Sequence, residues 1–230
     1  MFDDWPKERL IRAGLIGVLA VLVAVGLWKT SDRPARDREV VMRRCRRVMG
    51  TSCTLAAIVP MQRRTEAQLA LDEAESAIRA IEGRMSSWLD ASEISRLNEA
   101  PAGRKIALSP GTLTVLGVAH DAAQQTDGAF DVTCRPLIEL WREAGQNGKR
   151  PETTQRSAAR ALSHWEQIAL LSDGAIKHRD TMQVDLGGIA KGYAIDRAVD
   201  VLRRIGPIGG MVDIGGDLAC FGKPAEGQFW

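Results

Sequence analysis

The segment Asp185-Leu-Gly-Gly-Ile-Ala-Lys-Gly-Tyr193 constrains the fold of this chain more than any other part of the sequence. We expect a strand to end at Asp185, and two glycines then open a helix that runs from Gly188 to Ile205. Lys191 falls in the first turn of that helix. Helix N-termini carry unpaired N–H groups and positive dipole density, and glycines let a ligand approach the backbone, so this arrangement predicts an anion site. A tight strand-to-helix turn without a ligand is the other interpretation.

The segment matches neither of the two common phosphate-binding motifs. No Gly-Lys pair in the chain is followed by Ser or Thr, which excludes a P-loop. The glycines at 187, 188 and 192 do not have the G-x-G-x-x-G spacing of dinucleotide-binding folds. An anion site here therefore depends on the helix start and on Lys191.

Hydrophobic spacing and turn residues predict interleaved helices and strands elsewhere. Apolar residues between Thr65 and Glu82 recur at steps of three and four, which is typical of a helix, and Gly83 is expected to end it. Ser109 followed by Pro110 predicts another helix start. Because helices and strands interleave, we expect an α+β (mixed α/β) fold. The other expected elements are extended structure over 39–60 with a bulge or close backbone approach at Gly50, a loop over 146–152, a helix over 154–162, and strands over 168–171, 181–184 and 211–214.

The charge balance and the metal-ligating residue types exclude two classes of function. Lys and Arg number 31 against 29 Asp and Glu, a net charge of +2, which is too balanced for a dedicated nucleic-acid binder. The three histidines are scattered, and no two cysteines form a C-x-x-C pair, so a zinc site of the usual spacing is absent. We expect free, partly buried thiols at the cysteines, which are Cys45, Cys53, Cys134 and Cys220.

Residues 13–28 form an uncharged and almost wholly apolar run. The run has 16 residues, just below the roughly 17–25 of a spanning helix, and Trp5 and Trp28 bracket it. A cleaved signal peptide is disfavoured because no small-x-small pattern follows the run, and a buried core helix because linker-like residues follow it. We therefore expect an uncleaved anchor, which divides the chain into an N-terminal tail over 1–12, the membrane anchor over 13–28, a linker over 29–38 and a folded domain over 39–230.

Three further segments carry chemistry-bearing residues but are weak signals by themselves. Gly128-Ala-Phe-Asp-Val-Thr133 is expected to leave a helix end in extended form, and an aspartate beside a glycine is most often turn chemistry. Arg84-Met-Ser-Ser-Trp-Leu-Asp90 places a methionine and a tryptophan past a helix end, where such residues are more often core than cofactor contacts. Val212-Asp-Ile-Gly-Gly-Asp217 alone predicts only a tight turn.

Taken together and in order, these segments resemble the ApbE family, flavin transferases that take FMN from FAD and attach it to a protein. The resemblance runs from about Arg47 to the end of the chain. It implies a T-fold-like flavin transferase domain of mixed α/β type. The matching stretches are Val48–Thr51, Met85–Asn98, Gly128–Asp131, Pro136–Trp141, Asp185–Asp196 and Val212–Asp217.

The resemblance assigns binding or catalytic roles to residues of these stretches. Met49 and Trp88 would line the pocket for the flavin ring, and Gly188 would lie beside a bound magnesium ion. Asp185 and Lys191 are also the implied catalytic residues. The residues implied to contact FAD are Met49, Trp88, Ala129, Phe130, Asp131, Asp185 and Lys191.

The implied reaction cleaves the pyrophosphate of FAD, releases AMP and passes FMN to a Ser or Thr hydroxyl of an acceptor protein. Magnesium and Lys191 would neutralise charge that develops on the phosphate oxygens. A carboxylate must then take the hydroxyl proton, unless the metal makes that unnecessary. Asp185 is a candidate for this base, and a ligand-holding role is the alternative for the same residue.

The sequence departs from the family pattern at its C-terminus. Family members run further, through a His-x-x-Asp-Pro-x-Thr-Gly segment and an Asp/Thr cluster of magnesium ligands, whereas this sequence stops at Trp230. We therefore expect a C-terminally incomplete domain. Its function is then either the flavin transfer itself or, as an alternative, that of a membrane-tethered flavin-binding fragment without catalytic activity.

Two indications of cellular location disagree. Three Lys or Arg residues precede the apolar run and eight follow it up to Arg47, which by the positive-inside rule keeps the body in the cytoplasm. The family, however, works outside the cytoplasm, usually with a lipoprotein cysteine or signal that the apolar run would replace here. We expect the inner membrane with the body on the periplasmic side, and an acceptor that is a membrane redox subunit.

Overall fold

The computed structural model describes residues 37–224, which form an elongated molecule with a four-stranded sheet toward one end. The sheet has the order β1-β2-β6-β7 and every neighbouring pair is antiparallel. Its strands are β1 (Arg38–Val48), β2 (Thr51–Pro60), β6 (Gly209–Ile214) and β7 (Asp217–Gly222). Two tight turns, at Met49-Gly50 and at Gly215-Gly216, therefore connect the outer pairs.

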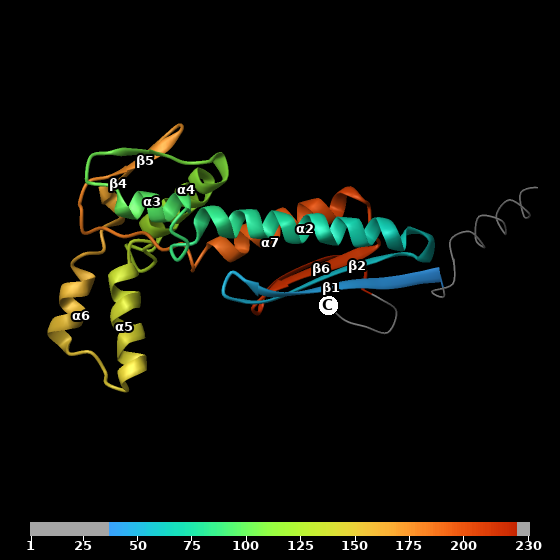
Figure 1. Ribbon diagram of the computed structural model, residues 1–230, viewed down its shortest axis with the longest axis horizontal. Helices are drawn as coiled ribbons and strands as arrows, with labels where there is room; N and C mark the ends of the chain where they lie inside the picture. The colour runs from blue at the N-terminus through green and yellow to red at the C-terminus, as the bar shows by residue number, and fades with distance from the viewer. Residues whose placement is uncertain (1–36, 225–230) are drawn as a thin grey trace, which may run out of the picture.

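Two long helices, α2 (Arg64–Met85) and α7 (Ala190–Arg204), pack side by side over one face of this sheet (Figure 1). Each helix buries an apolar stripe at the spacing that the sequence predicts, with Ile78 in α2 and Leu202 in α7 fully inaccessible to solvent. Burial of a side chain of this size contributes about 1.5–3 kcal/mol to stability. This layer of helix on sheet is the main core of the described chain.

The other end of the molecule holds a smaller sheet and two helices. The three-stranded antiparallel sheet has the order β3-β5-β4, with β3 (Lys105–Ala107), β5 (Gly174–Lys177) and β4 (Ile168–Leu171). Helices α3 (Glu93–Glu99) and α4 (Pro110–Gln125) lie beside it (Figure 1). Single turns η2 (Met61–Arg63) and η3 (Trp165–Gln167) precede α2 and β4.

Helices α5 (Arg135–Asn147) and α6 (Thr153–Arg160) form a hairpin that projects away from both sheets (Figure 1). Neither helix contains a buried residue. Gly148 ends α5 with a left-handed backbone, φ 64°, and Glu152 with Gln155 forms a capping box at the start of α6. Local capping therefore sustains this hairpin more than packing does.

The mixed fold and most of the predicted elements are confirmed. The Ser109 hydroxyl accepts a hydrogen bond from the Thr112 N–H, with Pro110 as the first helical residue, as its sequence predicts. Helix α6 and the strands β4 and β6 lie where they were expected, and α7 begins two residues after the predicted start. The described cysteines are free, as predicted.

Four local predictions are wrong. Gly50 is not a bulge within one extended segment but the second residue of the turn between two strands. Gly83 does not end α2, which continues to the buried Met85. The segment after Gly128 forms turns, and the expected loop over 146–152 begins only at Gly148, after the end of α5.

The predicted strand over 181–184, and with it the strand end at Asp185, is also wrong. The side chain of Asn98 takes the place of a neighbouring strand: its Nδ2 donates to the Val184 carbonyl at 2.9 Å and its Oδ1 accepts from the Val184 N–H at 2.7 Å. The buried Lys177 ammonium donates to the carbonyls of Asn98, Asp180 and Met182. These bonds give the backbone polar groups of the segment their partners without a neighbouring strand, so the segment stays an irregular loop.

The apolar run over 13–28 lies outside the described residues, as do residues 225–230. None of the helices within residues 37–224 combines the length and the hydrophobicity that spanning a membrane requires. The predicted domain boundaries therefore remain predictions.

Candidate functional site

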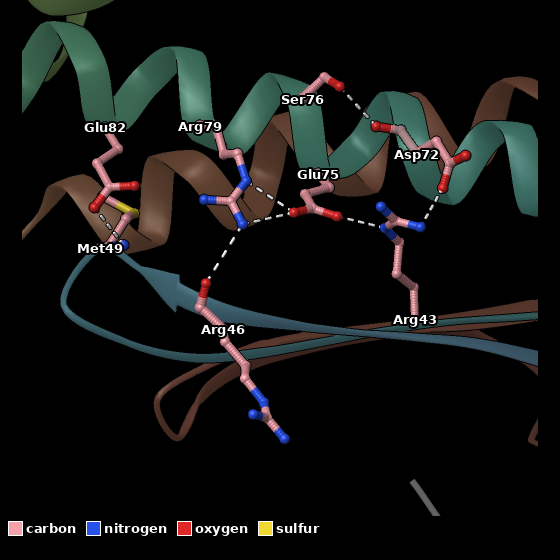
Figure 2. A network of polar contacts seen from close by, with 8 residues as sticks. All are labelled: Arg43, Arg46, Met49, Asp72, Glu75, Ser76, Arg79 and Glu82. Atoms are coloured by element: carbon pink, nitrogen blue, oxygen red, sulfur yellow. Dashed lines mark hydrogen bonds and ion pairs between the residues drawn. The ribbon is translucent and has the colours of Figure 1, made fainter.

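The turn between β1 and β2 holds Met49 in an unusual backbone conformation. Met49 has φ 48° and Gly50 has φ 75°, so both central residues of the turn are left-handed. Hairpin turns of this kind favour Asn, Asp or Gly at the first position, not Met. The Met49 N–H donates to Oε1 of Glu82 at 2.7 Å (Figure 2), and this bond ties the turn to the last part of α2.

The loop after α2 presents Trp88, whose side chain is 53% exposed. The guanidinium of Arg142 lies 4.0 Å from the centre of the Trp88 ring and that of Arg135 lies 4.9 Å from it. Arg135 also donates to the Ser87 carbonyl at 2.8 Å. Helix α5 therefore holds the indole of Trp88 in place through cation–π contacts. Because the tryptophan is exposed, it does not serve as a core residue.

Asp185 is 9% exposed and its two carboxylate oxygens have different partners. Oδ2 accepts from the Ser87 hydroxyl at 2.6 Å, and Oδ1 accepts from the Gly187 N–H at 2.8 Å. A Cβ at Gly187 would come within 2.9 Å of Oδ1, so a larger residue there would displace the carboxylate from this position. The carboxylate is thus fixed in position between the loop after α2 and the start of α7.

Lys191 lies in the first turn of α7, as its sequence position predicts, and its Nζ contacts Oδ2 of Asp217 at 2.5 Å. Asp217 follows the diglycine turn between β6 and β7, whereas Asp213 uses Oδ1 to accept from the Gly216 N–H at 2.9 Å. One of the two carboxylates around this turn therefore shapes the turn, and the other pairs with the candidate ligand-binding lysine.

The loop over 127–134 brings Ala129, Phe130 and Asp131 to the other side of Asp185. Oδ1 of Asp131 accepts from the N–H and from the hydroxyl of Thr133, both at 2.7 Å, so it organises its own loop. The Phe130 ring lies next to Gly188. The Asp185 N–H donates to the Val132 carbonyl at 2.7 Å, which joins the loop to the α7 start.

Two hollows result, and Asp185 lines both. The first hollow, of about 450 Å³, lies between the β1–β2 turn, the end of α2 and the start of α7. The second hollow, of about 730 Å³, lies between the 127–134 loop, the start of α5 and the segment around His164. The first contains Met49, Trp88, Asp185 and Lys191, and the second contains Ala129, Phe130, Asp131, Asp185 and Gly188. The structure thus brings every sequence-predicted site residue to one of two adjoining hollows.

The environment of the second hollow keeps its thiol protonated. Burial raises the pKa of Cys134, and the negative charges of Asp131 and Asp185 raise it further. Because the thiolate is the nucleophilic form of cysteine, this shift disfavours a nucleophilic role for Cys134.

The described residues do not fit a magnesium site by themselves. Across residues 37–224 no three His, Cys, Asp or Glu side chains lie close enough together to hold a metal ion. Magnesium requires near-octahedral oxygen coordination, and Gly188 could offer only a backbone carbonyl to it.

Sequence reasoning missed three residues that line the first hollow or fix its walls. Ser87 holds Asp185, Glu82 holds Met49, and Arg142 stacks on Trp88. Ser87 adjoins Trp88 in the matching stretch and could have been found there. Arg142 directly follows the matching stretch Pro136–Trp141 and could have been found in the same way. Glu82 carries no such signal, because it acts through a partner 33 residues away.

The chain is similar to known proteins along most of its length. A family model described as the ApbE family matches residues 49–230. The FAD:protein FMN transferase of Vibrio cholerae serotype O1 is 32% identical over 162 residues, which cover 69% of this chain and 48% of that protein. The protein of the same name from Haemophilus influenzae is 31% identical over 170 residues, with 69% of this chain and 48% of that protein covered. The chain spans about half the length of these curated relatives.

Solved structures agree with the sequence matches. The apo form of the Pseudomonas stutzeri flavinyl transferase ApbE superposes with a TM-score of 0.71 at 27% identity, covering 84% of this chain and 62% of that one. The flavin transferase ApbE from Vibrio cholerae gives a TM-score of 0.71 at 29% identity with the same two coverages.

Proposed function

Because the chain belongs to the ApbE family, we propose that it binds FAD across the two hollows and transfers FMN to a hydroxyl group of an acceptor protein. The observation that carries this proposal is the position of Asp185, which lines both hollows. A dinucleotide is long enough to need two adjoining pockets, and their sizes lie in the range usual for ligand sites. The pyrophosphate would then lie near Asp185 and the start of α7.

The first hollow suits the flavin ring. Trp88, a partly exposed aromatic residue, lies at its rim, and Met49 adds an apolar wall. Planar ring systems stack on aromatic faces, and a methionine adapts to the edge of a ring. The second hollow, with Phe130 at its wall, would take the adenosine part.

Lys191 would neutralise phosphate charge. Its side chain extends from the first turn of α7, where the helix dipole favours an anion. Without a ligand the lysine is held by Asp217, an exposed partner from which a phosphate can attract it. Binding of the phosphate therefore only needs to turn the Lys191 ammonium from Asp217 toward the ligand.

The proposed chemistry has one bond made and one broken. The oxygen of a Ser or Thr hydroxyl attacks the phosphorus on the riboflavin side of the pyrophosphate, and the bond to the AMP phosphate breaks, so that AMP leaves. Asp185 would accept the hydroxyl proton, because a carboxylate that already receives two hydrogen bonds still has free lone pairs. We propose magnesium dependence as well, but assign no step to the ion, because residues 37–224 gather no ligand cluster for it.

We further propose that residues 13–28 anchor the chain in the inner membrane with the body on the periplasmic side, next to a membrane redox subunit as acceptor. The apolar run and its flanking tryptophans support the anchor. Separation of membranes from soluble protein, with and without the run, tests it. Protease added outside spheroplasts would digest a periplasmic body and leave a cytoplasmic one intact.

The function is tested by incubating the chain with FAD, magnesium and a Ser- or Thr-containing acceptor, with and without chelator. Chromatography of the mixture would reveal AMP, and flavin fluorescence of the denatured acceptor would reveal bound FMN. Release of AMP that the chelator abolishes, with fluorescent acceptor, supports the transfer. FAD retained without AMP would instead support the flavin-binding alternative, and no binding of FAD would contradict both.

A further inference from the structure

The residues that link α2 to the β1–β2 hairpin are not all equivalent. Figure 2 shows carboxylates on one face of α2 directed toward the hairpin. Glu75 pairs with Arg43 and with Arg79, and Asp72 also pairs with Arg43, so these contacts fasten the body of β1. Two helical turns further on, Glu82 contacts the turn itself, through the Met49 N–H.

The turn has a conformation that its sequence does not favour. Arg47 and Met49 are two of the three non-glycine residues with positive φ in the described chain, and the strand register shifts between Cys45 and Val48. Positive φ is costly for residues with a Cβ and persists only where the surroundings enforce it. Because such residues gather at ligand clamps, a Met at this position is better explained by the hollow it lines than by the turn.

Glu82 is placed to enforce this conformation. Its Oε1 accepts from the Met49 N–H at 2.7 Å, a charge-assisted bond to a backbone group, and its side chain lines the first hollow beside Met49 and Gly50. The other contacts of Figure 2 that reach the hairpin end at Arg43 and at the Arg46 carbonyl, which is three residues before Met49. Glu82 is therefore the member of this network that touches the turn.

We propose that Glu82 is a positioning residue for flavin binding: its carboxylate holds the left-handed Met49-Gly50 turn against α2 and so keeps Met49 in the wall of the first hollow. The inference rests on the proposed function, because Met49 matters to the ligand only if the first hollow takes the flavin ring. Glu82 itself is not assigned a contact with substrate.

The matched control is Glu75, which is a glutamate on the same face of α2 and also binds β1, but does not reach the turn. We would compare the full chain with Glu82→Ala, Glu82→Gln and Glu75→Gln. Two readouts are needed: hydrogen exchange of the Met49 amide, and FAD affinity from quenching of flavin fluorescence. Thermal unfolding of each variant establishes that it is folded under the conditions used.

We expect the Met49 amide to be protected in the wild type and in Glu75→Gln, and to exchange at least about tenfold faster in Glu82→Ala, because its acceptor is lost. FAD affinity should fall by about tenfold in Glu82→Ala, since a charge-assisted hydrogen bond contributes on this order. Glu82→Gln keeps an acceptor oxygen, so its FAD affinity and its Met49 exchange rate should lie between those of the wild type and of Glu82→Ala. Glu75→Gln should unfold at a lower temperature but bind FAD as the wild type does.

A second comparison removes the need for the carboxylate. In a Met49→Gly background the left-handed turn carries no Cβ penalty, so adding Glu82→Ala should lower FAD affinity by clearly less than it does in the wild type. An equal loss in both backgrounds would overturn the inference. So would wild-type protection of the Met49 amide and wild-type FAD affinity in Glu82→Ala. If the wild-type chain binds no FAD, the proposed function fails, and with it the effect on affinity, while hydrogen exchange still decides whether Glu82 holds the turn.

Discussion

The two hollows are built in different ways although they share Asp185. The first is bounded by the ends of regular elements: the β1–β2 turn, the end of α2 and the start of α7. The second is bounded mainly by the 127–134 loop and the segment before β4. The elements around the first are held together by the apolar stripes of α2 and α7, and hydrogen bonds from Ser87 and to Glu82 fasten its walls. The loop around the second is held mainly by polar contacts, such as the His164 N–H that donates to the Thr133 hydroxyl. Packing thus dominates at the first hollow and hydrogen bonding at the second.

The largest effect is expected where both hollows meet. Asp185→Ala should lower AMP release from FAD by about 10²–10⁴-fold, the usual contribution of a positioned acid or base. Asp185→Asn keeps an oxygen for the Gly187 N–H but no charge, so it should fold like the wild type and lose most of the activity. Rates measured by chromatography of AMP at saturating FAD test this. Full activity in Asp185→Asn would rule out the proposed base.

The second hollow and the 181–184 loop beside it form the loop-built side of the molecule. Its stability should be the more sensitive to loss of one polar side chain. Asn98→Ala leaves both backbone groups of Val184 without a partner in a buried place, and we expect a loss of about 2–3 kcal/mol of unfolding free energy. Asn147→Ala, at the exposed end of α5, is the matched control and should change stability by no more than about 0.5 kcal/mol. Urea unfolding gives both numbers. Equal, small effects would mean that the Asn98 bonds do not hold the loop.

Two aromatic substitutions test which hollow binds which end of FAD. Trp88→Ala should weaken binding of riboflavin and of FAD alike, by about tenfold, because the ring loses its stacking face. Phe130→Ala should weaken FAD binding by a smaller factor and leave riboflavin binding unchanged, because the second hollow takes the adenosine part. Fluorescence titrations with both ligands measure the ratio. A loss of riboflavin affinity in Phe130→Ala would contradict the assignment of the flavin ring to the first hollow and of the adenosine part to the second.

The smallest predicted effect concerns the packed side of the molecule, where α2 and α7 cover the four-stranded sheet. It is a change in the stability of this side with pH. Burial alone would raise the pKa of Glu75, but hydrogen bonds from Arg43, Cys45 and Arg79 outweigh it and lower that pKa to about 2 from an ordinary 4.5. The carboxylate therefore stabilises the fold above about pH 4.5, and this contribution is lost as the pH falls toward 2.

Because its arginine partners are partly exposed, we expect Glu75→Gln to cost about 1 kcal/mol at pH 7. Urea unfolding at pH 7, 5 and 3 should show that the gap to the wild type narrows at the lowest pH. Glu66→Gln, which removes a more exposed pair with Arg63, is the control and should show a smaller difference. A gap that widens on acidification would contradict the assigned pKa direction.

Sequence reasoning predicted the packed side better than the loop-built side, for a physical reason. The apolar stripes of α2 and α7 are local patterns that determine local structure. The strand expected over 181–184 has the right composition, but the amide of Asn98, 86 residues away, satisfies Val184 in place of a neighbouring strand. No local pattern contains that information.

The candidate site divides in the same way. Family stretches indicated Met49, Trp88 and Asp185, and the structure brings them to one hollow. They gave no indication of Glu82, whose partner lies 33 residues away, and in α5 they reached only as far as Trp141, the residue before Arg142. Long-range polar contacts that support a site leave little trace in one sequence, because many residue types tolerate the same surface position.

The most direct test of the account is whether the two hollows form one dinucleotide site. Equilibrium dialysis would measure binding of FAD, riboflavin and AMP to the chain, each alone and in competition. The account predicts one FAD per chain, with an affinity above that of either part, and displacement of FAD by riboflavin and by AMP separately. Simultaneous binding of FAD and AMP without competition, or two FAD molecules per chain, would contradict it.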